Sequence, residues 1–405
     1  MEKLRTFLIE PSNGLWGLYN AGEKDNLKKE LQRYKKPKKF YEGTQIIVLN
    51  TTNECNLNCV YCSAREVRSM IKMPLEIAKK SLERAIEGKY IPEIVFHGSE
   101  PTLNMDLIVG TVNYGRELEK ASGRKLEFYL QTNLAHLDNI ALKFIHQNRI
   151  AVSTSMDGTR DIHNASRPYS NGKPSYDDVK NNINRVLEVQ DGICAICVVT
   201  KDNVHHLNEI VYNFEEIGIT DIQLLPSVRC SKNGADFAPK CEDITENYLE
   251  VFDTTFSKMI NGKQKINVRN IKQYLKTFFF ESGIDSCRIC SSSPYHPLLA
   301  VDTDGDVYPC DFFWGDKRKV VGNVLIDSFE SMLNHPNNPR MIPIERTDCS
   351  ECDWRNLCGG GCMADRLFNG GKPDYCEMHK SIYSYLSKKI PELIKNGLLK
   401  KIMLD

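Results

Sequence analysis

The stretch CNLNCVYC, residues 55–62, places three cysteines at a C-x3-C-x2-C spacing just after a β-rich run. A structural zinc site takes four ligands, and a disulfide framework takes an even number of cysteines, so three clustered thiols suit neither. Iron–sulfur clusters are held by cysteine thiolates. A cubane with only three protein ligands leaves one iron open to an external molecule. The triplet therefore predicts such a cluster, with an incomplete zinc loop and a chance grouping as the alternatives.

The composition is that of a soluble globular protein in a reducing compartment. The chain has 405 residues, is 41% hydrophobic, and carries 53 basic and 53 acidic residues. This balance gives no reason to expect nucleic acid or a membrane surface as a partner. No apolar run is long enough to cross a bilayer, and residues 1–17 lack the pattern of a signal peptide. We expect a cytoplasmic protein whose 15 cysteines, clustered along the chain, serve soft metal centres rather than disulfides.

Six β-rich runs alternate with helical patterns in the first half of the chain. The runs span residues 44–50, 92–98, 125–133, 150–158, 193–200 and 221–226. Strands that alternate with helices predict an α/β fold with a parallel sheet and right-handed crossovers. In such folds the functional loops follow the carboxyl ends of the strands.

The triplet resembles the signature of the radical S-adenosylmethionine (SAM) enzymes, C-x3-C-x-aromatic-C. Cys55, Cys59, Tyr61 and Cys62 match every position of it. The resemblance implies a partial (β/α)6 TIM-type barrel in which the three cysteines hold a 4Fe–4S cluster and SAM chelates its open iron. One electron from that cluster then cleaves SAM to methionine and a 5′-deoxyadenosyl radical.

Loops after the later strands are similar to the SAM contacts of this family. HGSEP, residues 97–101, stands where the family has a Gly-Gly-Glu-Pro loop, and its glutamate can accept hydrogen bonds from the SAM ammonium. LQTN and SMDG resemble contacts to the ribose and methionine parts, and the arginine of HNASRP could face the SAM carboxylate. Ordinary turn chemistry explains several of these residues equally well. The predicted SAM contacts are Tyr61, Gly98, Ser99, Glu100, Pro101, Gln131, Asn133, Ser155, Asp157 and Arg167.

A second group of eight cysteines lies between residues 287 and 376. Seven of them occur in a fixed order: a C-x14-G-x4-C segment, then a C-x2-C-x5-C-x3-C segment, then one last cysteine. This order resembles the SPASM domain of radical SAM enzymes that modify peptides and proteins. The resemblance implies two auxiliary 4Fe–4S clusters, and therefore three clusters in all. The inner one would use Cys290, Cys310 and Cys362, with Cys287 as the eighth cysteine that closes it. The outer one would use Cys349, Cys352, Cys358 and Cys376.

Asp311 directly follows Cys310 in the run VYPCD. In the sulfatase-maturing members of the family, the aspartate at this position is the base that takes a proton from the substrate, and the resemblance gives Asp311 that catalytic role. Capping of the local backbone is the alternative. The expected domains are an N-terminal extension at 1–43 that could dock a leader peptide, a barrel at 44–242, a helical bridge at 243–285, a SPASM domain at 286–380, and a C-terminal helix at 381–405.

The cysteines outside both groups carry no assigned chemistry. Cys194 and Cys197 lie three residues apart on a predicted strand, so they face opposite sides and are expected to be buried free thiols. Cys230 and Cys241 match no motif.

The resemblance implies an enzyme that modifies a precursor peptide or protein under anaerobic conditions. Thioether formation in a ribosomally made, cysteine-rich peptide is the main expectation for the reaction. The alternative is an anaerobic sulfatase-maturing enzyme that oxidises cysteine or serine to formylglycine. Either reaction needs an electron donor of the flavodoxin or ferredoxin type. A cluster-carrying electron-transfer scaffold without radical chemistry is a third possibility, but it would not need the HGSEP loop.

Overall fold

The computed structural model describes residues 5–10, 15–20, 44–64, 69–88, 91–228, 232–279, 298–338, 349, 351–368 and 371–404. Cys230, Cys287 and Cys290 lie outside these ranges. Within them, no helix is long and apolar enough to cross a membrane.

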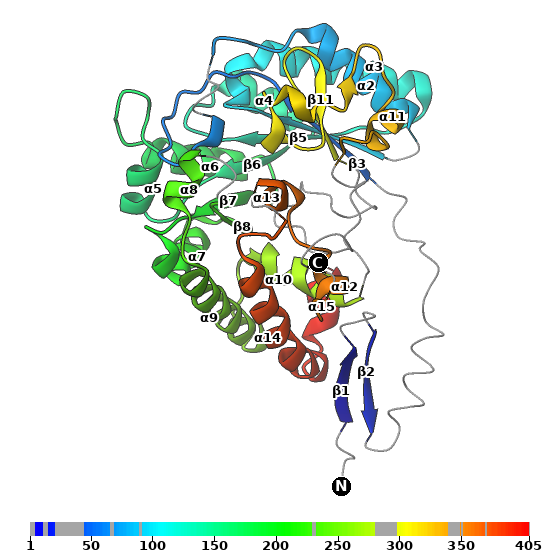
Figure 1. Ribbon diagram of the computed structural model, residues 1–405. Coiled ribbons are helices and arrows are strands. Elements are labelled where there is room, and N and C mark those ends of the chain that lie inside the picture. The colour runs from blue at the N-terminus through cyan, green and yellow to red at the C-terminus, as the bar shows by residue number, and fades with distance from the viewer. Residues whose placement is uncertain are drawn as a thin grey trace.

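A ten-stranded sheet organises the molecule, with strand order β12-β11-β10-β3-β4-β5-β6-β7-β8-β9. Its first six strands in the sequence are parallel and confirm the predicted series (Figure 1). They are β3 (Thr44–Asn50), β4 (Ile91–His97), β5 (Glu127–Thr132), β6 (Ala151–Ser155), β7 (Cys194–Val199) and β8 (Asp221–Pro226). With their crossover helices they form the expected α/β partial barrel.

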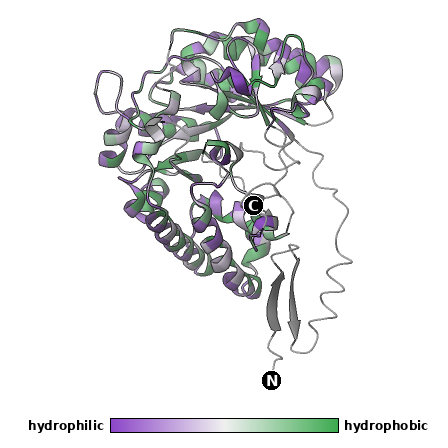
Figure 2. Cartoon of the chain, in the orientation of Figure 1, coloured by the Kyte–Doolittle hydropathy of each residue, from purple (hydrophilic) through white to green (hydrophobic). Residues whose placement is uncertain are grey.

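Helices alternate with these strands and cover their outer side (Figure 1). They are α2 (Leu75–Glu87), α3 (Met105–Ser122), α4 (Asn139–Gln147), α5 (Arg160–Ser166), α6 (Tyr176–Leu187) and α7 (Leu207–Ile217). Local sequence sets their ends: the Asp138 carboxylate caps α4 by accepting from the Ala141 amide at 2.7 Å, and Gly123 ends α3 with a left-handed φ of 71°. Figure 2 shows hydrophobic and hydrophilic residues interleaved along these helices, as amphipathic helices require.

Alternation along the strands separates two buried clusters. Ile47, Leu49 and Phe96 pack outward against the helices in one continuous core. Ile46 and Val48, on the opposite face of β3, belong to a second cluster. That second cluster also contains Val95, Leu298, Ala300, Tyr308, Cys310, Phe313 and Ala364. The second cluster therefore brings barrel strands and the C-terminal half of the chain together.

Four strands beyond the predicted six extend the sheet at both edges. They are β9 (Asn267–Val268), β10 (Leu298–Val301), β11 (Asp306–Tyr308) and β12 (Gly322–Asn323). β10 pairs with β3 in parallel, whereas β10–β11 and β11–β12 are antiparallel. The region expected as a SPASM domain thus continues the barrel sheet. A separate antiparallel hairpin, β1 (Arg5–Glu10) and β2 (Leu15–Asn20), lies within the N-terminal extension.

The remaining helices belong to the C-terminal half and to the bridge that leads into it. They are α8 (Lys232–Phe237), α9 (Cys241–Ile260), α10 (Arg269–Phe279), α11 (Phe329–Leu333), α12 (Arg355–Cys358), α13 (Met363–Phe368), α14 (Cys376–Lys395) and α15 (Leu398–Leu404). The single C-terminal helix expected over 381–405 is wrong. Two helices occupy this region, because Gly397 takes a φ of 69° that ends α14.

Candidate functional site

The loop that carries the first cysteine triplet is pinned along its length. The Asn58 amide donates to the Pro168 carbonyl at 2.7 Å, and the Val60 amide donates to the Ser166 carbonyl at 3.0 Å. An isolated bridge also pairs Leu57 with Tyr169. The loop after β3 is therefore fixed by the segment that follows α5.

Side-chain donors approach the thiols of Cys55 and Cys59 in the triplet. Asn133 Nδ2 lies 3.8 Å from Cys55 Sγ, and Arg167 Nη1 lies 3.9 Å from Cys59 Sγ. Burial raises the pKa of the Cys59 thiol to about 12, so a thiolate here needs a cation or a metal to stabilise it. Among the described residues, no three His, Cys, Asp or Glu side chains converge on one point that could hold a single ion. In a cubane each cysteine binds a different iron, so separated thiols fit a cluster better than a mononuclear site.

The HGSEP loop follows β4 and is clamped to the chain just before the triplet. The Ser99 amide donates to the Thr52 carbonyl at 3.0 Å, and the Glu100 amide donates to the Glu54 carbonyl at 2.9 Å. Gly98 has a φ of 114°, and a Cβ there would lie 2.4 Å from Asn50 Oδ1. Only glycine fits at this position. Ser99 is not among the residues with positive φ, which explains why a serine is accepted where the family has a second glycine.

The Glu100 carboxylate is fully buried and joins the ends of β4 and β5. Its Oε1 accepts from Thr102 N, Thr102 Oγ1 and Thr132 Oγ1, and its Oε2 accepts from Asn133 N at 2.8 Å. Burial raises the pKa of Glu100, although these hydrogen bonds act in the opposite direction. Oε1 is saturated, so any ammonium contact falls to Oε2.

The other predicted SAM contacts also lie at the carboxyl ends of strands. Gln131, on β5, donates from Nε2 to Ser155 Oγ at 3.2 Å. Asn133 donates from Nδ2 to Asn56 Oδ1 at 2.8 Å, which ties the end of β5 to the triplet loop. Asp157 is fully buried, and Arg167 is nearly so. The structure therefore gathers the triplet, the HGSEP loop and these side chains at one end of the barrel.

Asp311 opens a short 3-10 turn (Asp311–Phe313) after β11, directly beside Cys310. The N-cap residue of this turn is Cys310, whose side chain makes no capping hydrogen bond, and no described backbone amide is recorded as a donor to the Asp311 carboxylate. The capping alternative therefore finds no support. Cys310 belongs to the second buried cluster, and Cys362 packs against the same cluster.

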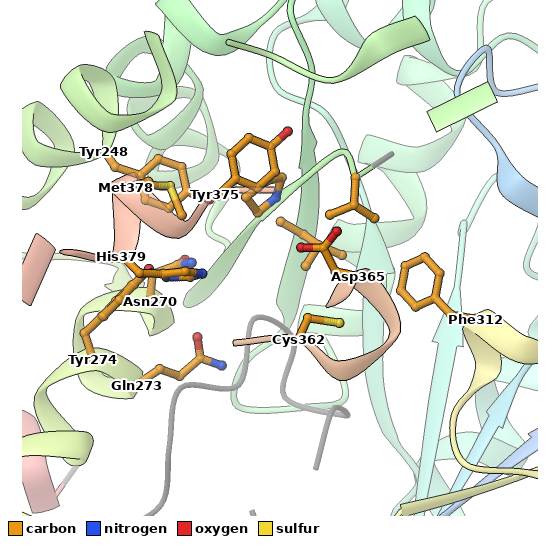
Figure 3. A pocket seen from close by; sticks show the side chains of 13 residues that line it. Tyr248, Asn270, Gln273, Tyr274, Phe312, Cys362, Asp365, Tyr375, Met378 and His379 are labelled. Carbon is orange, nitrogen blue, oxygen red and sulfur yellow. The ribbon is translucent and has the colours of Figure 1, made fainter. Parts of the chain in front are cut away.

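A cavity of about 50 Å³ lies between the end of β8 and helices α9, α10, α13 and α14 (Figure 3). Cys362 and Phe312, the residue after Asp311, are on its wall. Tyr274 Oη and His379 Nδ1 are 2.6 Å apart at its edge, and burial lowers the pKa of His379 to about 4. The imidazole is therefore neutral, and its Nδ1 shares a hydrogen bond with the Tyr274 hydroxyl.

A larger cavity of about 300 Å³ fills the barrel interior and runs up to Gln131 on β5. Its wall includes Tyr129, Ser153, Ile196 and Gln223. Leu225 lines both cavities, so they adjoin at β8. The larger cavity therefore runs inside the barrel from the amino ends of β6 and β8, at Ala151 and Asp221, up to Gln131.

The four predicted ligands of the outer cluster lie close together. Burial raises the pKa of the Cys358 thiol to about 12, and charges on Cys376, Cys349 and Cys352 raise it further. Cys349 and Cys352 are also joined through the backbone, where the Cys352 amide donates to the Cys349 carbonyl at 3.1 Å. Of the predicted inner ligands, Cys310 and Cys362 are described, whereas Cys287 and Cys290 lie outside the described residues.

Several side chains of the site were not predicted. Thr102 and Thr132 hold the Glu100 carboxylate, and His163 and Ser175 lie behind Arg167. The tyrosine–histidine pair in the smaller cavity joins helices more than 100 residues apart in sequence. Isolated threonine, histidine and tyrosine residues carry no spacing signal, so sequence patterns could not have found them.

Comparison with known proteins identifies both halves. Residues 49–211 match the radical SAM superfamily, and residues 296–353 match an iron–sulfur cluster-binding SPASM domain. A cysteine-type anaerobic sulfatase-maturating enzyme of Clostridium perfringens is 26% identical over 380 residues, which cover 87% of this chain and 98% of that protein. A serine-type anaerobic sulfatase-maturating enzyme of Bacteroides thetaiotaomicron is also 26% identical, covering 87% of this chain and 91% of that protein.

Solved structures agree with these matches. The structure of anSMEcpe with bound AdoMet and Cp18Cys peptide has a TM-score of 0.74 and 25% identity, and covers 87% of this chain and 98% of that one. Streptococcus suis SuiB bound to precursor peptide SuiA has a TM-score of 0.61 at 17% identity over 89% of this chain and 80% of that one, a likeness of fold. The chain therefore contains a radical SAM domain and a SPASM domain and is a radical SAM enzyme whose cofactors are SAM and 4Fe–4S clusters.

Proposed function

We propose that this enzyme oxidises a cysteine or serine side chain of a protein substrate to formylglycine, the reaction of an anaerobic sulfatase-maturating enzyme. The observation that carries the proposal is similarity along almost the full length of relatives with that name, of both the cysteine and the serine type. Asp311 supports it, because its carboxylate stands beside Cys310 without a backbone partner among the described residues.

Thioether formation, the main expectation from the sequence, has less support. Sulfatase-maturating enzymes of Clostridium perfringens and Clostridium novyi match over 98% of their own length. A mycofactocin maturase of Mycolicibacterium smegmatis matches at 24% identity over 79% of this chain, which supports a maturase in the broader sense. Thioether formation therefore stays as an alternative outcome of the experiment below.

In the proposed reaction, the cysteine triplet and the HGSEP loop would serve the radical step, and Asp311 would serve the proton transfer. When bound, SAM and the clusters supply the radical that takes a hydrogen atom from the substrate carbon and accept the second electron of the oxidation. Cys55, Cys59 and Cys62 would hold the first cluster, and the HGSEP loop would orient SAM. Asp311 would take the proton that leaves the substrate thiol or hydroxyl, and water would then hydrolyse the thioaldehyde formed from cysteine to the aldehyde with release of hydrogen sulfide. A flavodoxin- or ferredoxin-type protein would supply the starting electron.

Anaerobic incubation with a peptide that spans the active-site cysteine of a sulfatase from the same genome tests the proposal. The reconstituted enzyme, SAM and a chemical reductant complete the mixture. We expect the peptide to lose its sulfur and to gain an aldehyde that a hydrazide reagent captures, as read by mass spectrometry. A peptide that keeps its sulfur but loses an alkylatable thiol would move the assignment to thioether formation.

Asp311→Asn tests the proposed base separately. The variant should still cleave SAM to 5′-deoxyadenosine, whereas aldehyde formation should fall about 10²-fold, the usual loss on removing a general base. Asp316→Asn is the matched control, because Asp316 lies on the same segment and pairs with the exposed Arg318. Equal aldehyde yields from Asp311→Asn and the wild type would remove Asp311 from the mechanism.

A further inference from the structure

Three side chains behind the first cysteine triplet form a buried ionic group: Tyr61, Asp157 and Arg167. Asp157 is fully buried, Arg167 is 6% exposed and Tyr61 is 9% exposed. They come from three separate places in the chain: the triplet itself, the loop after β6, and the end of α5. A buried charge pair is costly unless its partners are well placed, so the contacts of each member decide what the group does.

The Asp157 carboxylate is occupied on both oxygens. Oδ2 accepts from Tyr61 Oη at 2.5 Å and from Ser166 Oγ at 2.8 Å, and it lies 2.9 Å from Arg167 Nε as an ion pair. Oδ1 accepts from the Val198 amide at 3.1 Å. Burial alone would raise the pKa of Asp157, but the Arg167 charge and the hydrogen bonds from Arg167 and Tyr61 together outweigh burial and lower that pKa. Asp157 is therefore ionised, and protein groups engage both of its carboxylate oxygens.

Arg167 is fixed from several sides. The plane of its guanidinium faces the Tyr61 ring, with Cζ 5.4 Å from the ring centroid. Its carbonyl accepts from Ser175 Oγ at 2.6 Å, and its amide donates to the His163 carbonyl at 2.7 Å. His163 Nε2 in turn contacts Ser175 Oγ at 3.1 Å. The guanidinium therefore has little freedom to move.

The fixed guanidinium points its Nη1 at Cys59 Sγ, 3.9 Å away. Reduction of an iron–sulfur cluster adds one negative charge, and nearby positive charge or hydrogen bonds to the ligand sulfur favour the reduced state. A buried cation acts more strongly than an exposed one, because water screens it less. The Arg167 charge is therefore close enough to raise the reduction potential of a cluster bound by Cys59.

We propose that Asp157 and Tyr61 are positioning residues that hold Arg167 against Cys59, and that the Arg167 charge raises the reduction potential of the cluster bound by the triplet. This role is separate from any contact between Arg167 and the SAM carboxylate, because it operates without SAM. It rests on the cofactor class of the enzyme and not on the identity of its substrate.

The test is a redox titration followed by electron paramagnetic resonance, on reconstituted full-length enzyme without SAM and without peptide. The signal of the triplet cluster is identified as the one missing from a variant in which Cys55, Cys59 and Cys62 are all alanine. In Arg167→Gln, the reduced-to-oxidised ratio at a fixed potential should fall about tenfold, which corresponds to about 59 mV for a one-electron couple. Arg160→Gln, which removes an exposed arginine on the same helix, should leave the ratio unchanged.

Two further variants keep the test decisive if Arg167→Gln loses iron. Arg167→Lys keeps the charge but not the planar fork, so its midpoint should lie between the wild type and the glutamine variant. Asp157→Asn leaves the arginine uncompensated and should raise the midpoint. A wild-type midpoint in Arg167→Gln with full iron content would overturn the proposal. A lower midpoint potential in Asp157→Asn would also overturn it. So would equal midpoint potentials in Arg167→Lys and Arg167→Gln. Formylglycine yield plays no part in this readout, so failure here leaves the proposed substrate class untouched.

Discussion

The loop with the first cysteine triplet and the region with the later cysteines are held in place by different means. The triplet loop lies between long parallel strands and is tied by backbone hydrogen bonds to residues 166–170. The later cysteines lie on or near short elements, such as the four-residue helix α12 and the six-residue helix α13. Regular structure therefore surrounds the first group, whereas the second group, apart from Cys376 at the start of α14, lies on or near short elements.

Two buried arginines, one in each half of the chain, also differ in how the protein holds them. Arg167 in the barrel half faces the ionised Asp157 at 2.9 Å. Arg167 Nε makes no well-aligned hydrogen bond but lies in this ion pair, whereas among the described residues Nε and Nη1 of Arg366 on α13, which is 8% exposed, have neither a hydrogen bond nor an ion pair. Each unsatisfied buried donor costs about 1–3 kcal/mol. We infer that the C-terminal half depends more than the barrel half on what its cysteines bind, which the experiments below test.

The largest effect is expected at the triplet itself. Cys59→Ala removes a predicted cluster ligand that is buried in the barrel core, so 5′-deoxyadenosine production should fall to the level of a reaction without enzyme. Cys197→Ala, at another buried cysteine of the barrel core, is the matched control and should keep SAM cleavage. Wild-type cleavage by Cys59→Ala, measured by liquid chromatography, would show that the triplet is not the radical site.

Iron removal tests the contrast between the halves directly. Without iron, amide hydrogen exchange should become about 100-fold faster over residues 349–395, because metal binding there contributes to folding. The strands β3 to β8 should change less than about fivefold, because their protection comes from ladder hydrogen bonds and core packing. Mass spectrometry on peptic fragments gives both values. Equal loss of protection in the two halves would mean that the barrel also depends on its cluster.

Acid should destabilise each half through one buried histidine. Burial lowers the pKa of both His163 and His379 from the ordinary 6.5 to about 4. Below pH 6.5 these histidines are protonated in the unfolded chain but stay neutral in the folded chain. The free energy of unfolding therefore falls as the pH drops. Between pH 6.5 and pH 5 the loss should be about 2 kcal/mol per histidine, measured by urea unfolding.

Single variants assign this loss to one half or the other. His163→Gln should flatten the pH dependence of barrel unfolding, and His379→Gln that of the C-terminal half. Glu100, whose raised pKa acts in the opposite sense, is present in both variants and cancels from the comparison. A pH slope that both variants leave intact would place the acid sensitivity elsewhere.

The smallest effect is expected at an exposed ionic contact of the C-terminal half. Lys317 Nζ lies 2.6 Å from both Asp304 and Asp306, yet its side chain is 61% exposed. Lys317→Ala should therefore cost less than about 1 kcal/mol, and added salt should reduce that cost. Arg160→Ala, which breaks the exposed pair with Asp177 in the barrel half, is the matched control and should behave alike. A loss above about 2 kcal/mol at Lys317 alone would show a structural role for the β11 turn.

The six barrel strands could be predicted because each is a short β-rich run between helical patterns. The two cysteines of β7 illustrate how far such reasoning reaches. Cys194 lines the barrel cavity, whereas Cys197 belongs to the outer core, as a period of two requires for residues three apart.

The rest depended on contacts that no local pattern encodes. β10 and β11 are only four and three residues long, and they form because they pair with β3 and with each other. Asp157 and Arg167 were both predicted at the SAM site, but their pairing behind Cys59 was not. The sequence shows which residues are charged, whereas the direction of a buried side chain depends on what packs around it.

The pairing of β3 with β10 also bears on how the chain is made. Asn50 at the end of β3 donates to Asp302, 252 positions later. During translation, the edge of β3 that will pair with β10 therefore stays unpaired while the whole barrel is synthesised. It can pair only when about residue 300 has left the ribosome. Unpaired edges of apolar strands are sites where chains associate wrongly. We therefore expect the sheet to be completed only after the barrel strands have been synthesised. Until then, β3 is the part of the nascent chain that most needs protection by a chaperone.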